Sequence, residues 1–153
     1  PETSIRAVVS ELYAIVSGPG DLPRDWTRQA ELFMPQAHMV RTVVGDDGVA
    51  RPEVIRAADY PANFEQKMGG RDFYEVEIHS VIEVFGNIAH VFSTYEAYED
   101  EARARFLKRG INSIQLYKVE GTWKIAGMVW DDERDGQRTG PRYLPASAGA
   151  DSR

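Results

Sequence analysis

The sequence predicts an α+β fold in which long antiparallel strands form a sheet that packs against helices. Residues 73–133 divide into four strand-like segments, joined by turns at Gly86-Asn87 and Glu120-Gly121. Both faces of these strands carry apolar residues, so both faces need cover. Helical periodicity is confined to the part of the chain before residue 71, which places the helices ahead of the sheet.

The first helix is predicted over residues 4–17, with Thr3 or Ser4 as its N-cap and Gly18 just beyond its end. Its apolar positions recur at helical spacing and define one buried face. That face comprises Ile5, Val8, Val9, Leu12, Ile15 and Val16.

Two shorter helices follow, with a strand pair between them. Asp25 is the expected N-cap of the second helix, and Pro35 is expected to end it. Residues 38–44 and 49–55 read as strands joined at Asp47-Gly48. The third helix starts near Asp59 and Pro61 and ends at Gly69-Gly70.

The first long hairpin can be registered from its turn. A two-residue loop at Gly86-Asn87 pairs Phe85 with Ile88 and places Glu83 opposite His90. Alternation then predicts a core face, and a bulge would swap the sides beyond it. The predicted core face comprises Tyr74, Val76, Ile78, Ser80, Ile82, Val84, Ala89, Val91, Ser93, Tyr95 and Ala97.

The second long hairpin is registered in the same way from Glu120-Gly121. This register places Leu116 opposite Ile125 and Asn112 opposite Val129. It predicts an inner face of Gly110, Asn112, Ile114, Leu116, Trp123, Ile125, Gly127, Val129 and Asp131. The predicted outer face includes Ser113, Gln115, Met128 and Trp130.

Composition limits the classes of function. With 153 residues and 42% hydrophobic content, the chain suits one domain with a substantial core, over residues 1–134, followed by a tail over 135–153. A net charge of -6 gives no general attraction for nucleic acid or anionic lipid. The chain has no cysteine and no apolar run of membrane-spanning length, so we expect a soluble cytoplasmic protein.

The order of elements resembles the nuclear transport factor two-like superfamily. The residues that carry the resemblance are 85–93, 109–116 and 121–125, and it spans about residues 3–134. It implies a cone-shaped, strongly bent, mostly antiparallel sheet wrapped around N-terminal helices, with an internal pocket. It also implies dimers across the outer sheet face. Enzymes such as ketosteroid isomerases and SnoaL-like cyclases share this fold with transport factors and simple binders, so it does not specify an activity.

We expect no metal and no cofactor. The histidines are His38, His79 and His90, without close ligand spacing, and the serines lie on strands without a nucleophile-elbow motif. His90 opposite Glu83 suggests a catalytic dyad, but a cross-strand polar pair on the outer face is the favoured interpretation.

The predicted inner face supplies the catalytic candidates Asp131, Tyr95 and Asn112. A carboxyl group in an apolar cleft has a raised pKa, which suits proton transfer, and a neighbouring phenol or amide can hold an oxyanion. The alternative is that Asp131 ends its strand in solvent or pairs with Arg109. Candidate ligand-binding residues are Tyr13, Trp26, Tyr60, Phe64, Ser93 and Trp123, although aromatics at helical spacing more often form plain core.

Three functional hypotheses remain open from the sequence. The first is a SnoaL-like protein that binds a small apolar molecule without turnover. The second is a cofactor-free acid/base enzyme, such as a cyclase, isomerase, dehydratase or hydrolase, acting on a polyketide-like or terpenoid-like compound. The third is a protein-interaction module. A homodimer through the outer sheet face is expected, with contributions from Phe92, Ser113, Gln115, Met128 and Trp130.

Overall fold

The computed structural model describes residues 1–146. Its helices are α1 (Glu2–Val16), α2 (Trp26–Leu32) and α3 (Tyr60–Met68), with short 3₁₀ turns η1 (Ala57–Asp59) and η2 (Pro141–Tyr143). Its strands are β1 (Phe33–Val44), β2 (Ala50–Arg56), β3 (Tyr74–Phe85), β4 (Ile88–Tyr98), β5 (Phe106–Val119) and β6 (Thr122–Asp132).

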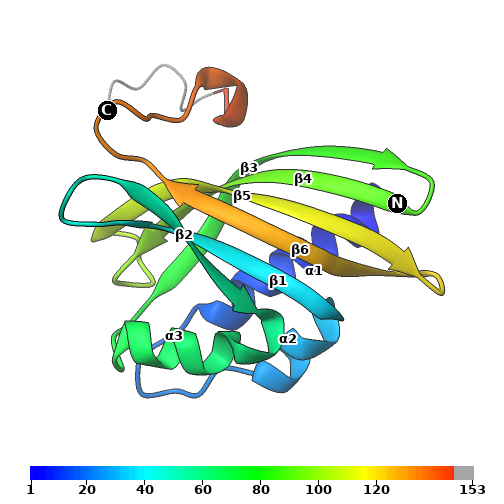
Figure 1. Ribbon diagram of the computed structural model, residues 1–153, viewed down its shortest axis with the longest axis horizontal. Coiled ribbons are helices and arrows are strands. Elements are labelled where there is room, and N and C mark those ends of the chain that lie inside the picture. The colour runs from blue at the N-terminus through cyan, green and yellow to red at the C-terminus, as the bar shows by residue number, and fades with distance from the viewer. Residues whose placement is uncertain (147–153) are drawn as a thin grey trace.

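The strands form one curved sheet in the order β2-β1-β6-β5-β4-β3. Neighbouring strands are antiparallel except for β1 and β6, which run parallel. The three helices lie together on one side of this sheet, and the chain after β6 lies on the other (Figure 1). The predicted α+β cone, with a mostly antiparallel sheet around N-terminal helices, is confirmed.

Helix α1 buries the predicted face, because Ile5, Val9 and Leu12 are almost fully covered. The predicted caps are wrong. The helix begins at Glu2 with Pro1 in the N-cap position, so Thr3 and Ser4 already lie within its first turn. An acidic residue at this end suits the positive end of the helix dipole, which compensates for the missing side-chain cap.

The shorter helices begin and end close to the predicted residues. The Asp25 carboxylate accepts a hydrogen bond from the Arg28 amide at 3.0 Å, which confirms it as the N-cap of α2. The helix ends at Leu32, three residues before Pro35, and the chain enters β1 at once. Helix α3 ends at Gly69, whose left-handed φ of 59° suits glycine.

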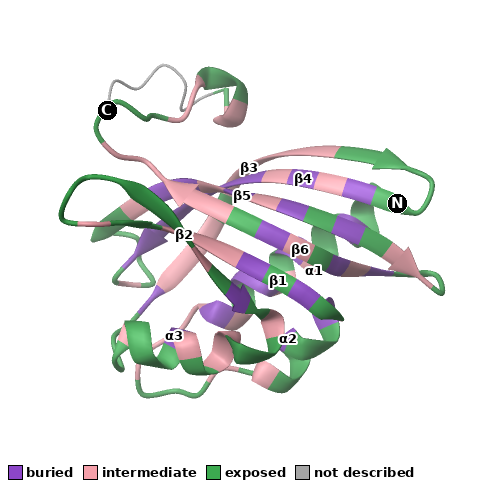
Figure 2. Cartoon of the chain, in the orientation of Figure 1, coloured by how far each residue is buried: buried purple, intermediate pink, exposed green. Residues whose placement is uncertain are grey.

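The core lies between α1 and the concave face of the sheet. Ile5, Ile114 and Ile125 are fully buried there. Buried and exposed residues alternate along β5 and β6, as expected for strands with one covered face (Figure 2).

The β3–β4 hairpin has the predicted register near its turn and a different one farther away. Phe85 pairs with Ile88 and Glu83 with His90, as predicted. A bulge at Ile78 then shifts the register, because Glu77 pairs with Tyr95 while His79 pairs with Thr94. Beyond this bulge the faces are exchanged, so Tyr74 and Val76 leave the predicted inner face, and Glu75 and Glu77 occupy it.

The β5–β6 hairpin contains a second bulge. Leu116 pairs with Ile125, as predicted, but Gln115 pairs with Gly127, which leaves Ala126 as the extra residue. Asn112 therefore pairs with Trp130 and not with Val129. The predicted faces beyond Ala126 are wrong. Met128, Trp130 and Asp132 face inward, whereas Val129 and Asp131 face outward.

The described part of the C-terminal segment packs on the outer face of the sheet. The Thr94 hydroxyl donates a hydrogen bond to the Tyr143 carbonyl at 2.7 Å, and the Tyr143 ring lies 5.1 Å from that of Phe92. The predicted tail begins before this contact, and its last seven positions, 147–153, lie outside the described residues. Among residues 1–146, no helix is long and apolar enough to cross a membrane.

Two glycines on neighbouring strands provide a matched test of this packing. A Cβ at Gly110 would lie 2.4 Å from both the Tyr95 hydroxyl and the Asp131 carbonyl, whereas one at Gly127 would only meet the His38 carbonyl at 3.5 Å. We expect Gly110→Ala to lower the free energy of unfolding by about 1–3 kcal/mol. Gly127→Ala should be nearly neutral in the same urea titration. Equal effects would contradict the close approach of Tyr95.

Candidate active site

A cavity of about 230 Å³ lies between the helices and the concave face of the sheet. Helices α1 and α3 and strand β6 contribute mostly apolar side chains, and strands β1, β3, β4 and β5 contribute most of the polar ones. Its lining comprises Leu12, Val16, Met39, Arg41, Tyr60, Phe64, Lys67, Met68, Arg71, Phe73, Glu75, Tyr95, Lys108, Asn112, Met128 and Trp130.

Aromatic rings form much of the cavity wall. The Tyr60 ring meets Trp130 edge-on at 6.4 Å, and Phe64 contacts Phe73 at 6.0 Å. Such edge-to-face contacts are a preferred geometry of aromatic pairs and stabilise the wall by about 0.5–1.5 kcal/mol each beyond the burial of their area. The cavity therefore has firm apolar walls, against which a few polar groups are placed.

Glu75 projects into this cavity as a consequence of the Ile78 bulge. Its backbone amide donates to the Ser17 hydroxyl at 3.0 Å, which ties β3 to the end of α1. Within residues 1–146 its carboxylate receives no hydrogen bond that would stabilise the charged form. Burial raises the pKa of this carboxyl from its ordinary 4.5 to about 7, with Lys108 opposing the shift and Asp132 adding to it.

Tyr95, Asp132 and Lys108 form a second polar cluster. The Tyr95 hydroxyl, on a side chain only 1% exposed, donates to one carboxylate oxygen of Asp132, and Lys108 Nζ lies 3.2 Å from the other. Burial, followed by the charges of Asp132 and Glu75, raises the pKa of Tyr95 and keeps its proton in place. Lys108 uses one of its three N–H donors in this contact and retains donors for a ligand.

A chain of hydrogen bonds connects the cavity wall to β3. The Asn112 amide donates to the Tyr13 hydroxyl at 3.0 Å, and Tyr13 lies 2.7 Å from the Ser93 hydroxyl. Ser93 gives its only proton to Glu77 at 2.5 Å, so Tyr13 must be the donor to Ser93. This chain fixes Asn112, whose side chain lines the cavity.

The structure brings some of the sequence-predicted site residues together. Tyr95, Asn112, Tyr60 and Phe64 line the cavity. Tyr13 and Ser93 lie behind Asn112 in the hydrogen-bonded chain. Trp26 packs edge-on against Phe64 at 5.2 Å, outside the cavity lining. Trp123 is buried in the core beside Lys118, also away from the cavity.

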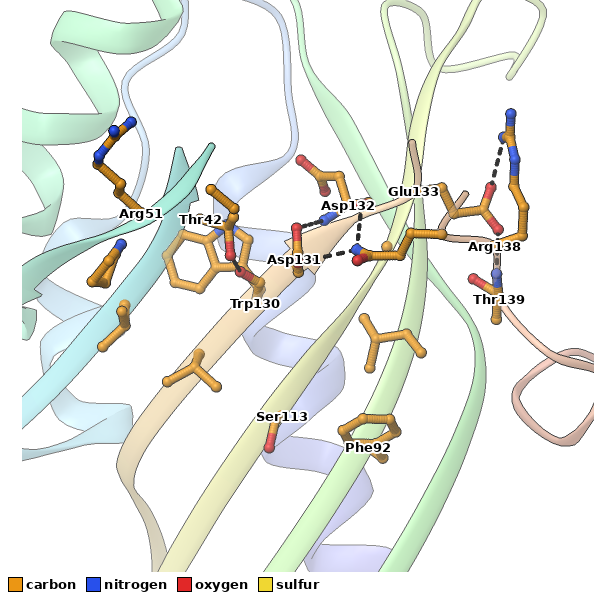
Figure 3. A pocket seen from close by; sticks show the side chains of 17 residues that line it. Thr42, Arg51, Phe92, Ser113, Trp130, Asp131, Asp132, Glu133, Arg138 and Thr139 are labelled. Carbon is orange, nitrogen blue, oxygen red and sulfur yellow. Dashed lines mark hydrogen bonds and ion pairs between the residues drawn. The ribbon is translucent and has the colours of Figure 1, made fainter. Parts of the chain in front are cut away.

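The expected inward position of Asp131 is wrong. Its side chain is 39% exposed and lines a groove on the outer face (Figure 3). The Arg134 guanidinium lies 2.6 Å from it, and Gln137 donates a hydrogen bond to it at 3.0 Å. Burial alone would raise the pKa of Asp131, but the hydrogen bonds from Arg134 and Gln137 outweigh it and lower the pKa. Asp132 occupies the inward place beside Tyr95 because of the bulge at Ala126.

Sequence reasoning missed the charged residues that line the cavity, which are Arg41, Lys67, Arg71, Glu75 and Lys108, and the Asp132 carboxylate that accepts a hydrogen bond from Tyr95. Counted from the hairpin turns, Glu75 and Asp132 lie beyond the bulges at Ile78 and Ala126. Gly127, next to Ala126, is a signal for the second bulge that was present in the sequence. Arg41 lies two residues after the apolar Met39 in a predicted strand, so both side chains share one face of the sheet. This spacing was present in the sequence and could have placed Arg41 on the inner face. Within residues 1–146 no group of three or more His, Asp or Glu side chains could hold a metal ion.

The outer face of the sheet carries a second, more open groove of about 550 Å³ (Figure 3). Phe92, Ile111 and Val129 provide its apolar floor, and the segment with Gln137 and Thr139 forms one rim. His90 lies on this outer face too, with its Nδ1 3.9 Å from Glu83, which agrees with a cross-strand polar pair.

The raised pKa of Glu75 predicts a dependence of stability on pH. A carboxyl that is harder to ionise in the folded state stabilises the fold fully below pH 4.5, and this contribution is lost as the pH rises to about 7. At pH 8, Glu75→Gln should therefore unfold at a higher urea concentration than wild type, with a free energy of unfolding larger by up to about 3 kcal/mol. Near pH 4 this difference in the free energy of unfolding should disappear. A gap independent of pH would contradict the cavity position of the carboxyl.

No family model matches the chain, and no curated protein sequence matches it. Solved structures do match. A protein of unknown function with a cystatin-like fold from Nostoc punctiforme aligns with a TM-score of 0.67 at 9% identity, covering 86% of this chain and 90% of its own. A nuclear transport factor two-like protein of unknown function from Pseudomonas putida aligns with a TM-score of 0.65 at 12% identity, covering 90% of this chain and 92% of its own.

A third similar structure is a hexachlorocyclohexane dehydrochlorinase, LinA-type3, from Novosphingobium barchaimii. It aligns with a TM-score of 0.64 at 14% identity, covering 87% of this chain and 86% of its own. Identities this low establish a shared fold and leave activity open. The resemblance expected from the sequence is confirmed at that level: the chain has the nuclear transport factor two-like, or cystatin-like, fold.

Proposed function

We propose that this chain is a cofactor-free acid/base enzyme that binds a small, mostly apolar molecule in the internal cavity and uses Glu75 as its base. The observation that carries the proposal is the position of the Glu75 carboxylate, which the Ile78 bulge turns into an aromatic-walled cavity and which has no hydrogen-bond donor among residues 1–146. Binding without turnover was one hypothesis from the sequence, and the proposal retains its binding step.

A general base works best when its pKa lies near the working pH, because it is then both available and strong enough. Burial places the Glu75 pKa at about 7. The absence of a hydrogen-bonded partner among the described residues leaves the carboxylate free to approach a substrate proton. A purely structural carboxylate in such a wall would be expected to have a donor or a cation in contact.

Proton removal leaves an electron pair on the substrate, and Lys108 is the candidate for stabilising it. Lys108 lines the same cavity and is held by Asp132, which Tyr95 holds in turn. Because Asp132 holds the Lys108 ammonium group in place, this group can stabilise a developing oxyanion or a leaving group. Tyr95 and Asp132 act as positioning residues, since the Tyr95 proton is already committed to Asp132.

The size of the cavity restricts the substrate. Its volume of about 230 Å³ is below the roughly 300–1,000 Å³ of sites for drug-sized ligands. We therefore favour a single-ring compound over a multi-ring polyketide or terpenoid. The reaction class is proton transfer from carbon or water, as in an isomerisation, elimination or hydrolysis.

Deuterium exchange tests the proposal without knowledge of the natural substrate. Small cyclic ketones, with and without a carboxylate, are incubated with the protein in D₂O, and incorporation next to the carbonyl is followed by NMR. Glu75→Gln should reduce the rate by about 100-fold or more. The rate should rise with pH up to about 7, as the Glu75 carboxylate forms.

The matched control is Asp131→Asn, which removes the neighbouring outward carboxylate. It should leave exchange unchanged. Exchange that survives in Glu75→Gln would refute the catalytic role of Glu75. Saturable ligand binding without exchange of any compound would favour the binding protein over the enzyme.

We also propose that the chain forms a homodimer through the outer face of the sheet. The supporting observation is the open groove, whose floor includes the half-exposed Val129 with Phe92 and Ile111. A sheet face exposed to water is normally polar, so an apolar one favours a partner. Met128 and Trp130, expected in this interface from the sequence, face the cavity instead.

Sedimentation at micromolar concentration should give twice 17.2 kDa. Val129→Asp should produce a monomer, because a charge in an apolar contact is costly to bury. Leu22→Asp changes an exposed leucine in the loop between α1 and α2, and the dimer should persist. A wild-type protein that sediments as a monomer would refute this proposal and leave the groove available to a different partner.

A further inference from the structure

We infer that the ligand of the internal cavity carries an anionic group, such as a carboxylate, that binds at Arg41. The inference rests on the proposed function, since it names the substrate class for the same cavity. The chain as a whole has a net charge of -6, yet Arg41, Lys67, Arg71 and Lys108 all line this cavity. Basic side chains gathered in one cavity of an acidic protein favour a negatively charged ligand.

Arg41 is held in a binding position and has donors to spare. Its side chain is 18% exposed and lies over the Trp130 ring at 5.5 Å. Its Nη1 donates to Glu53 at 2.7 Å and to Asn63 at 2.8 Å. Neither Nε nor Nη2 donates to a residue of the described chain. A guanidinium has five N–H donors in a planar fork, so a carboxylate can bind the remaining ones.

The local charge balance leaves this end of the cavity positive. Lys67 lies 3.9 Å from the same Glu53 carboxylate that pairs with Arg41, so two cations share one anion. Arg71 donates to the Lys67 and Met68 carbonyls at the end of α3. Its positive charge has no carboxylate partner within residues 1–146. An anionic group would complete this arrangement at little cost in side-chain entropy, because Arg41 is already fixed.

Glu75 and Arg41 both act on Tyr60 in the cavity wall. Burial raises the pKa of Tyr60 most, the Glu75 charge raises it further, and the Arg41 charge lowers it. A ligand with its anionic group at Arg41 would lay an apolar body along Trp130 and Tyr60 and present its other end to Glu75. The anionic group would then hold the ligand in one orientation, which positions the reacting atom.

Benzoate and its neutral isostere benzamide test the inference by calorimetry, at one pH above the pKa values of both benzoate and Glu75. Wild type should bind benzoate more tightly than benzamide. Arg41→Gln should weaken benzoate binding by about tenfold or more, because a charged hydrogen bond is lost, and should leave benzamide unchanged. Arg41→Lys should restore part of the affinity. Arg56→Gln, at an exposed arginine paired with Asp59, is the control and should bind as wild type does.

Two further variants keep the test decisive. If Arg41→Gln fails to fold by circular dichroism, Lys67→Gln removes the second cation on Glu53 and should weaken benzoate by a smaller factor. Glu75→Gln should retain benzoate binding, so a failure of the catalytic role of Glu75 leaves this inference standing. Equal binding of benzoate and benzamide, insensitivity to Arg41, or no benzoate binding by wild type would overturn the inference.

Discussion

The period-two alternation of β-strands, interrupted by the bulges at Ile78 and Ala126, determines which carboxylates face this cavity. A strand presents successive side chains to opposite faces, so one extra residue exchanges every position beyond it. The bulge at Ile78 brings Glu75 into the cavity, and the bulge at Ala126 replaces Asp131 with Asp132. The carboxylates of Glu75 and Asp132 both face inward because of these bulges. Burial in the cavity wall then raises the pKa of Glu75, and Lys108 binds Asp132.

Local signals in the sequence were sufficient for the elements and their turns. Helical periodicity located α1, the Asp25 cap located α2, and the turns at Gly86 and Gly121 set the pairs Phe85–Ile88 and Leu116–Ile125. Counting from a turn remains valid only up to the first irregularity. Ile78 is an ordinary strand residue whose type indicates no bulge, whereas Gly127 beside Ala126 is a signal for the second bulge. Every facing predicted beyond the two bulges was inverted.

The candidate site was therefore predictable only in part. In the strands of Tyr95 and Asn112, no bulge lies between these residues and the hairpin turn from which the register was counted. Both side chains line the cavity, as expected. Asp131 was expected to face inward because the register was counted from the Gly121 turn without a bulge. The extra residue Ala126 shifts this register by one and turns Asp131 outward. Structures with the same fold do not replace this missing information, because identities of 9–14% in the three aligned structures described above establish the fold alone. The chemistry has to be argued from the residues of this chain, whose cavity is lined by the carboxylate of Glu75 and by basic side chains that include Arg41 and Lys108.

The central claim is that the Glu75 carboxyl lies inside the cavity and not on the outer face. Carbon-13 NMR of the glutamate side-chain carboxyl groups, with Glu75→Gln to assign the resonance, measures its titration directly. The account predicts an inflection near pH 7. A Glu75 resonance that titrates near its ordinary 4.5 would show a solvated carboxyl and would contradict the account.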